Sequence, residues 1–392
     1  MKHNWEYKKL GEVCVSKSGI GRALKTFESN DEILYIDIAS IDNQKHSITS
    51  YTQTKLSEAP SRAQQCVKKE DILVSLVRPN LKNVAIVGDD ENNLVASSGF
   101  CVLRAGEDLL PQYVFQFVCS DKFTDYLVGL TAGANYPAVR EDDVRNAIVP
   151  VPPLEEQSRI VAELDLLTGI IDKQNAQLKE LDNLAQAIFY DMFGDPIENP
   201  KGWEIKKLGD VSTSVSYGTS SPSSTVGKYK YLRMNNITYE GFLDLTDLKY
   251  IDMDDAEFEK YSVREGDVLF NRTNSMDLIG KTTYIHDMEP MIIAGYIIRV
   301  RLADSVLPVY VSKFMNTPAM KKKLRGMAKG AVNQANINSK ELKNIDIPLP
   351  PLALQQSFAE KIQSIENQKA KIKASIVETQ KLLDYTMDKY FG

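Results

Sequence analysis

Two long segments of the chain repeat apolar residues at intervals that alternate between four and three positions. The first runs from Ile160 to Met192, and the second runs from Phe358 to Tyr390 in the same register. This alternation is the heptad pattern of helices that pack along a narrow apolar seam. The pattern therefore predicts two long helices, the first from Leu154 to Met192, whose seams most simply pack on each other. The predicted seam residues are Ile160, Leu164, Leu167, Ile171, Leu178, Leu181, Ile188, Phe358, Ile362, Ile365, Ile372, Ile376 and Leu383.

Shorter apolar runs of the β type precede each long segment. Each half also predicts one short helix and a proline-punctuated strand that leads into the long helix, because proline closes a strand. Each half of the chain thus predicts a compact α/β unit followed by a long helix. The expected strands are 33–38, 72–77, 84–87, 100–103 and 148–153 in the first half and 229–232, 268–270, 282–285, 292–300 and 345–351 in the second, with short helices at 111–120 and 308–316.

The chain is an internal duplication. The segment that begins at Trp5 returns at Trp203, the segment at Val149 returns at Ile347, and Phe193-Gly194 returns as Phe391-Gly392, each 198 positions later. A repeat of this length sets the architecture before any local pattern does. Inside the α/β units the offset slips to 196, which is how loops vary on a retained scaffold. We expect boundaries that divide the chain into 1–150, 151–197, 198–347 and 348–392.

Composition and charge narrow the class of protein. A hydrophobic content of 43% and a charged content of 26% are ordinary for a globular protein. No apolar run approaches the ~20 residues that span a bilayer, and the N-terminus has no apolar signal core, so we expect a cytoplasmic protein. The net charge of −6 is divided into −8 for residues 1–194 and +2 for residues 195–392. Only a local basic surface could therefore favour nucleic-acid binding.

The usual catalytic and metal-binding patterns are missing from the sequence. The four cysteines lie in the first half without a Cys-x-x-Cys spacing, which predicts buried reduced thiols. The three histidines form no metal-ligand pair, and no dinucleotide or Walker motif occurs. Asn135-Tyr136-Pro137 does not match the site of adenine methyltransferases. We therefore expect a non-catalytic protein that holds no metal.

Polar loops occupy corresponding places in the two halves. Arginine can hydrogen-bond to guanine through two atoms, and asparagine or glutamine can do so to adenine. The matched placement favours DNA recognition, while the alternative is that these loops are ordinary turns. The candidate DNA-binding residues are Lys17, Arg22, Arg78, Asn80, Lys82, Asn135, Tyr136, Tyr217, Ser220, Arg272, Thr273, Asn274, Asn333, Gln334 and Asn336.

One short segment is strongly basic. Five positive charges and no acid occur in the nine residues from 321 to 329. This cluster is a candidate for neutralising phosphates, and a solvated helix face explains it equally well. The candidate phosphate contacts are Lys321, Lys322, Lys323, Arg325 and Lys329.

The order of these features resembles the specificity subunit of type I restriction–modification enzymes. The most specific marks are the segments from Pro150 to Gln157 and from Pro348 to Gln356, each a Pro-x-Pro-Pro-Leu strand followed by glutamine. A heptad helix that ends in Phe-Gly follows, and Trp-Glu-x-Lys-Lys-Leu-Gly opens each unit. The resemblance covers essentially the whole chain. The second copy departs at Ala353-Leu354, where the first has Glu155-Glu156.

The resemblance implies an α+β fold with two tandem pseudo-symmetric target recognition domains, separated by two long helices packed as an antiparallel coiled coil. It implies that each domain reads one half of a split, asymmetric site in double-stranded DNA. It further implies two methyltransferase (modification) subunits that methylate adenine N6, and motor-nuclease (restriction) subunits that cleave unmodified DNA. S-adenosylmethionine, ATP and magnesium would then be bound by these partners, with no cofactor in this chain.

Two other classes of function compete with this interpretation. A non-catalytic coiled-coil scaffold with two protein-binding domains would show no dependence on DNA, and hydrophobic anchors would occupy the same loops. A self-contained nucleic-acid enzyme would need a catalytic set that the sequence lacks. The polar character of the loops favours the DNA-recognition subunit.

Overall fold

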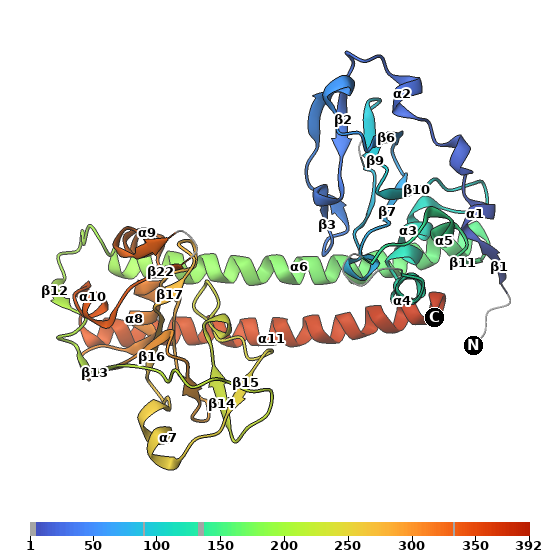
Figure 1. Cartoon of the computed structure of the whole chain (residues 1–392). Coiled ribbons are helices and arrows are strands. Elements are labelled where there is room, and N and C mark those ends of the chain that lie inside the picture. The colour runs from blue at the N-terminus through green and yellow to red at the C-terminus, as the bar shows by residue number, and fades with distance from the viewer. Residues whose placement is uncertain (1–4, 89–90, 132–136, 332–333) are drawn as a thin grey trace. The chain divides into compact units, whose positions relative to one another are not determined.

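The computed structural model describes residues 5–88, 91–131, 137–331 and 334–392, without the side chains of residues 331 and 334 (Figure 1). The chain forms two compact units. Unit 1 comprises residues 1–174 and 374–392, and unit 2 comprises residues 175–373. Each long helix therefore gives one part to each unit. The boundaries expected at 150, 197 and 347 separate functional domains from long helices, and they stay a prediction.

Unit 1 holds two main sheets and a short closing pair of strands. The sheet order is β10-β7-β8 in one and β5-β2-β9-β6 in the other, while β1 pairs with β11 and β3 with β4. Most short helices of the unit gather near the β1–β11 pair, whereas α2 lies apart from it near β2 and β6 (Figure 1). The strands are β1 (Glu6–Lys9), β2 (Glu32–Ile36), β3 (Ile41–Asp42), β4 (Ser47–Ile48), β5 (Thr52–Lys55), β6 (Ala63–Cys66), β7 (Ile72–Ser75), β8 (Val84–Ile86), β9 (Leu94–Ser97), β10 (Phe100–Leu103) and β11 (Ile148–Val151). The α-helices are α1 (Leu10–Val13), α2 (Ala23–Thr26), α3 (Pro111–Cys119), α4 (Asp121–Gly129) and α5 (Glu141–Arg145).

Unit 2 repeats this plan with different loops. Its sheets have the orders β13-β20-β16-β18, β15-β14-β19 and β17-β22-β21, and β12 pairs with β23. The strands are β12 (Glu204–Lys207), β13 (Ser212–Tyr217), β14 (Tyr229–Leu232), β15 (Lys249–Ile251), β16 (Val268–Asn271), β17 (Thr273–Asn274), β18 (Thr282–Tyr284), β19 (Ile292–Ile293), β20 (Ile297–Leu302), β21 (Lys329–Ala331), β22 (Gln334–Asn336) and β23 (Asp346–Leu349). The helices are α7 (Asp255–Tyr261), α8 (Pro308–Met315), α9 (Pro318–Met327) and α10 (Ser339–Lys343).

The structure corrects two details of the expected elements. The run 292–300 is not one strand, because the chain leaves β19 at Ala294 and restarts as β20 at Ile297. At this break the Gly295 amide donates to the Thr219 carbonyl at 2.7 Å, which joins the break to the first polar loop. The short helix expected in each half is followed directly by a second one, α4 or α9, which the apolar pattern did not predict.

The cysteines are all free thiols, but the expectation that all are buried was wrong. Cys14 and Cys101 are buried, whereas Cys66 and Cys119 are only half-buried. Burial raises the pKa of the Cys14 thiol to about 11, so this thiol stays protonated at neutral pH.

A buried glutamine joins each α/β body to its long helix. Gln157 and Gln355 are both fully buried. The Gln157 carbonyl accepts from the Leu110 amide at 2.8 Å, and the Gln355 carbonyl accepts from the Leu307 amide at 2.9 Å. Each side-chain amide donates back to a proline carbonyl of the lead-in strand, at 2.8 Å and 2.9 Å respectively. The Pro-x-Pro-Pro-Leu motif with its glutamine is therefore a hydrogen-bonded connection that fixes the strand to the helix.

The long helices α6 (Leu154–Phe193) and α11 (Leu352–Phe391) have 40 residues each. In unit 1 the Gln174 amide donates to Ser375 Oγ at 2.8 Å, and in unit 2 Lys369 pairs with Asp182 at 2.5 Å. Residue numbers fall along α11 as they rise along α6, so within each unit the two helices are antiparallel. All thirteen predicted seam residues are buried or half-buried.

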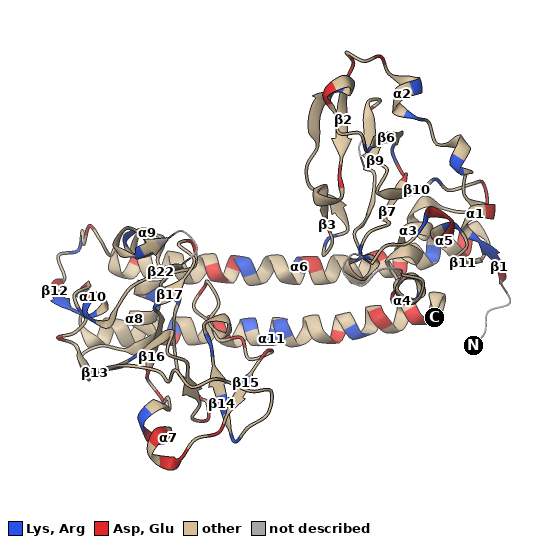
Figure 2. Ribbon diagram, in the orientation of Figure 1, with Lys and Arg blue, Asp and Glu red and all other residues tan. Residues whose placement is uncertain are grey.

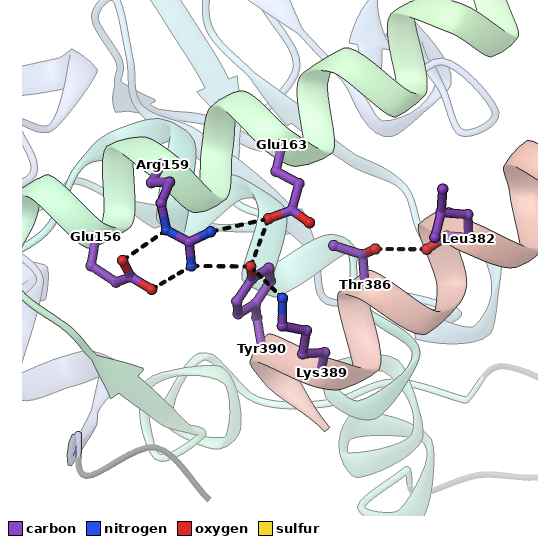
Figure 3. Close-up of polar contacts among 7 residues, drawn as sticks. All are labelled: Glu156, Arg159, Glu163, Leu382, Thr386, Lys389 and Tyr390. Carbon is purple, nitrogen blue, oxygen red and sulfur yellow. Dashed lines mark hydrogen bonds and ion pairs between the residues drawn. The ribbon is translucent and has the colours of Figure 1, made fainter. Parts of the chain in front are cut away.

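A polar network ties the end of α11 to the start of α6 in unit 1 (Figure 3). Arg159 pairs with Glu156 at 2.6 Å and donates to the Tyr390 hydroxyl at 3.2 Å. The same hydroxyl donates to Glu163 at 2.6 Å and accepts from Lys389 at 2.8 Å. Because Arg159 and Glu163 are partly exposed, we expect each ion pair to contribute modestly to the stability of unit 1. The Tyr390 hydroxyl, which is bonded to both side chains, fixes their positions.

The last aromatic ring of each long helix completes the core of a unit. In unit 1, Phe391 lies 5.4 Å from Tyr113 and 5.7 Å from Phe117, centroid to centroid. In unit 2, Phe193 lies 4.9 Å from Tyr310 and 5.1 Å from Phe358. The Phe-Gly ending that the sequence repeats is therefore a core element, and unit 1 takes its copy from the end of the chain.

We expect Phe391→Ala to lower the free energy of unfolding of unit 1 by about 3–5 kcal/mol, because it empties a fully packed aromatic site. Hydrogen exchange of the amides in β7 and β10 of the full chain measures this loss. The control is Leu382→Ala on the same helix, whose side chain is 52% exposed, and it should change stability by less than about 0.5 kcal/mol. Equal effects of the two variants would show that Phe391 is not part of the core.

Candidate nucleic-acid interface

In unit 1 the loop after β7 has an unusual backbone. Arg78 and Lys82 both have φ of 50°, in the left-handed region that side chains other than glycine rarely adopt. Such strain persists only where the surroundings hold it, and it concentrates at functional loops. Here the Arg78 amide donates to the Pro137 carbonyl at 2.8 Å, and Val77 forms a bridge with Ala138. The loop after the middle strand thus meets the loop before the terminal strand.

The predicted side chains of this loop differ in their exposure. Arg78 and Asn80 are exposed, whereas Lys82 is half-buried, with its ammonium on the Asp121 carboxylate and 3.4 Å from the Cys119 carbonyl. Asn135 and Tyr136 lie outside the described residues. Arg78 and Asn80 are therefore the described side chains best placed to reach a ligand.

The first polar loop of unit 1 divides between two places. Lys17 pairs with Glu141 at 2.5 Å, and Glu141 opens α5 directly behind the loop that meets Arg78. Arg22 lies elsewhere, at the start of α2, where it forms a backbone bridge with Gln65 beside β6. The structure thus places Lys17 near the junction of the two loops and places Arg22 apart from it.

Unit 2 brings its two loops together in the same way. The Ile337 amide donates to the Arg272 carbonyl at 2.9 Å, and β17 pairs with β22 so that Thr273 lies opposite Asn336. The Thr273 hydroxyl donates to the side-chain carbonyl of Asn336 at 3.0 Å. Three predicted residues therefore form one cluster.

Three more predicted residues of unit 2 lie beside this cluster or outside the description. Asn274 follows in β17, and its side-chain oxygen accepts from the Ser275 amide at 2.9 Å, as in a turn. Gln334 belongs to β22, and Asn333 lies outside the described residues. The Asn274 amide group keeps two donors that this turn does not use.

Arg272 and Tyr217 form the centre of the cluster in unit 2. The guanidinium carbon lies 4.8 Å from the centroid of the tyrosine ring, a cation–π contact. The Tyr217 hydroxyl accepts from the Ser339 amide at 2.8 Å, and Ser339 opens α10 as Glu141 opens α5. Arg272 Nε is buried without a hydrogen-bond partner among the described residues, and Nη1 makes one long bond of 3.4 Å to Gly295. The ring therefore holds the guanidinium in place while little of its donor capacity is used.

Tyr296 is a residue of this surface that the sequence analysis missed. It is 55% exposed, and its carbonyl accepts from the Arg272 amide at 2.9 Å. In the repeat Tyr296 corresponds to Phe100, since both follow a glycine. Phe100 is only 1% exposed, so this correspondence alone would have indicated a core position for Tyr296. Ser220, which is exposed, flanks the same break in the sheet next to Thr219.

The basic segment does not form one open face. Lys322 is exposed, Lys323 and Arg325 are half-buried, and Lys329 pairs with Glu341 at 2.7 Å. Lys321 is only 5% exposed, and its ammonium donates to the Tyr239 carbonyl. Figure 2 shows the charges of both signs spread over the strands and helices of the unit. Lys322 and Lys329 of the segment are thus exposed, whereas Lys321 and Arg325 line a cleft of unit 2.

Neither a metal-binding cluster nor a membrane-spanning helix occurs in the described part of the chain. No group of three or more His, Cys, Asp or Glu side chains there lies close enough to hold a metal ion. No helix there has an apolar stretch long enough to cross a bilayer.

Two repeated α/β units, each with exposed polar loops joined by backbone pairing, are the arrangement of a protein with two recognition surfaces. The family model of the type I restriction modification DNA specificity domain matches residues 2–183 and 200–379. The chain therefore belongs to this family and is a type I specificity subunit, a non-catalytic DNA-recognition component.

Individual relatives agree with the family. The chain is 23% identical over 319 residues to the EcoKI specificity subunit of Escherichia coli K12, a match that covers 77% of this chain and 68% of that subunit. It is 27% identical over 198 residues to the HindI specificity subunit of Haemophilus influenzae, which covers 49% and 41%.

Solved structures show the same fold over nearly the whole chain. One, from a study of complex assembly and conformational transition in the type I R-M system, has a TM-score of 0.62 at 28% identity and covers 99% of this chain and 97% of that one. The S subunit from M. genitalium has a TM-score of 0.54 at 12% identity, with 100% and 97% covered. The α+β architecture predicted from the sequence is thereby confirmed.

We expect Arg272→Ala to relax base preference at one position of the DNA target, at a cost of about 1–3 kcal/mol if two of its unused donors bind one base. Selection from a randomised duplex pool by the subunit with its methyltransferase partner measures the preference. Arg264→Ala is the matched control, because Arg264 is an exposed arginine of the same unit that pairs with Glu259. If both variants keep the parental preference, Arg272 does not contact a base.

Proposed function

We propose that this subunit recognises a split, asymmetric site in double-stranded DNA, with one half-site read by each unit. The observation that carries this proposal is the repeated loop junction. In unit 1 the Val139 amide donates to the Leu76 carbonyl, and in unit 2 the Ile337 amide donates to the Arg272 carbonyl, both at 2.9 Å. The same backbone arrangement therefore presents a polar surface twice.

The side chains at the two junctions differ, which supports the asymmetry of the site. Unit 1 exposes Arg78 and Asn80 and places the Lys17–Glu141 pair at the helix start. Unit 2 places Tyr217 and Ser339 where the other unit has this pair, with Arg272 over the tyrosine ring. Different donors and acceptors in equivalent places would read different bases.

We further propose that the two long helices carry the modification subunits and set the gap between half-sites. Several large apolar side chains on these helices are exposed, which supports docking by a partner. They are Leu166, Leu184, Val377, Leu382 and Tyr385, each between 47% and 68% exposed. In this proposal the methyltransferase subunits bind S-adenosylmethionine and methylate adenine N6, while restriction subunits bring ATP and magnesium.

The charge of the chain fits a shared interface with DNA. A net charge of −6 opposes tight binding of a polyanion by the isolated subunit. The partners would then supply much of the positive surface that neutralises phosphates. A gel shift across a random DNA pool, with and without the methyltransferase, tests both points. We expect a bipartite sequence to be retained only with the partner; a pool with no sequence preference would refute the proposal.

We expect one heptad inserted into each long helix to lengthen the tolerated gap by about 3 base pairs, because seven residues add ~10.5 Å of helix and B-DNA rises ~3.4 Å per pair. The insertions belong between Gln174 and Asn175 and between Lys373 and Ala374, where the two units divide. Mapping of methylated adenines in cells measures the gap.

The control carries the insertion in α6 alone, which shifts the two seams out of register and should abolish modification. A gap that stays at its parental length in the double-insertion variant would show that the helices do not act as the spacer.

A further inference from the structure

A large cleft in unit 2 is unexplained by the recognition surface. Its volume is about 1060 Å³, and its walls come from the second part of α6, the segment 238–246, the junction of α8 with α9, and α11. Leu178, Phe189, Leu243 and Leu245 supply apolar surface. The volume is at the upper end of what small-molecule sites enclose.

The segment that roofs this cleft is firmly built. Gly241 has φ of 88°, and a Cβ there would collide with the Asn316 amide and the Thr282 carbonyl. The Asp244 amide donates to the Asn236 carbonyl at 2.8 Å, which closes the segment as a loop. The ring of Phe242 then lies 3.5 Å from Lys369 Nζ and 4.5 Å from Lys313 Nζ, centroid to nitrogen. The cleft is therefore a formed site and not a gap between loose loops.

Positive charge gathers in the cleft of an otherwise acidic chain. Six lysine and arginine residues line it against three acids, whereas the whole chain has a net charge of −6. Two of the cations are compensated, because Lys369 pairs with Asp182 at 2.5 Å and Lys313 lies 3.6 Å from Glu366. No ion pair among the described residues involves Lys321, Arg325 or Lys373, which share the cleft. The Glu240 carboxylate acts on Lys321 and the Asp244 carboxylate on Lys373 only from beyond ion-pair distance.

Lys321 is the most buried of these three cations. It is 5% exposed, lies 3.3 Å from the centroid of the Tyr239 ring, and donates to the carbonyl of that residue. An ammonium has three donors, so the two not directed at that carbonyl can serve a ligand. Burial, with the nearby charges of Arg325 and Lys281, lowers the pKa of Lys321 to about 8, and the Glu240 carboxylate opposes this shift. A buried cation destabilised in this way gains from an anion more than an exposed lysine does.

We propose that this cleft binds a phosphate group through Lys321, Arg325 and Lys373. A phosphate provides the negative charge that the three cations lack, and its oxygens accept the paired donors of a guanidinium. The apolar wall formed by Leu178 and Leu245 would face the organic part of a phosphate ester. The proposal does not depend on how the loops near Arg272 read bases, so either can fail without the other.

The binding has an expected pH dependence. A phosphate beside Lys321 favours the charged ammonium. When the pH lies above the pKa of Lys321 in the unbound protein, Lys321 must therefore take up a proton as the phosphate binds. Affinity should therefore fall as the pH rises through about 8 to 9, a range above the pH of about 6 at which the phosphate itself takes up its second proton. Glu240, Arg325 and Lys281 are the charged groups that face Lys321, and none of them titrates in that range in free solution.

The test is calorimetric titration of the full chain with inorganic phosphate and with adenosine monophosphate. We expect Lys321→Gln and Arg325→Gln each to weaken binding by at least about 10-fold, while Lys321→Arg keeps it and removes the pH dependence. Lys322→Gln is the matched control, because this neighbour on α9 is exposed and does not line the cleft. No binding by the parent chain, or equal weakening by Lys322→Gln, would overturn the proposal.

A second arm distinguishes a free phosphate ligand from a phosphate of the DNA backbone. If the group belongs to DNA, Lys321→Gln should reduce the slope of log affinity against log salt for a duplex by about 1, and inorganic phosphate should compete with the duplex. If the ligand is a small molecule, the salt slope should be that of the parent while phosphate binding is lost. A fluorescence or circular dichroism melt of each variant separates loss of the site from loss of the fold.

Discussion

The packing of one aromatic ring at the end of each long helix into the core of a unit is the constraint on which the rest depends. Phe391 closes the core of unit 1, and Phe193 closes that of unit 2. The same cores receive Tyr113 or Tyr310, whose hydroxyls donate to the carbonyls of Pro150 and Pro348 at 3.0 Å and 2.6 Å. The proline strand, the long helix and the α/β body are thus fixed to one another at a single buried place.

The recognition surface follows from this arrangement. The proline strand is preceded by a short helix, α5 or α10, and by the loop that pairs with the segment after the middle strand. Once the strand is fixed by the core, the position of that loop is fixed by backbone hydrogen bonds, which do not depend on the side chains it carries. Leu76 and Arg272 therefore accept equivalent backbone hydrogen bonds, from Val139 and Ile337, although one side chain is apolar and the other is a cation.

Much of the architecture was predictable because it rests on periodic or repeated signals. The heptads predicted both long helices, and the bounds expected for the first, Leu154 to Met192, are within a residue of those of α6. The repeated Phe-Gly and proline motifs marked the places where helix and body join. The matched polar loops were also found from the sequence, since the two copies align there. What the repeat could not reveal were contacts that differ between the copies. The Lys321 side chain faces inward because segment 238–246 covers it, and that segment has no counterpart in the heptad or strand patterns.

Tyr296 also shows that the repeat does not predict the exposure of a side chain. A glycine followed by an aromatic residue occurs in both copies, and the buried Phe100 would suggest a core role for each. The break between β19 and β20 turns Tyr296 outward instead, because Gly295 bonds to Thr219. Alignment of a repeat therefore identifies equivalent backbone, while the direction of a side chain depends on long-range pairing.

The use of Phe391 in the core of unit 1 has a consequence for synthesis of the chain on the ribosome. Unit 2 is encoded by one continuous stretch, residues 175–373, and this stretch is complete before residues 374–392 are translated. Unit 1 contains residues from 1–174, yet it also needs residues 374–392. The unit whose translation begins first is therefore the last to receive all of its core residues. A chain truncated between residues 373 and 391 would carry an intact second unit and a first unit without Phe391.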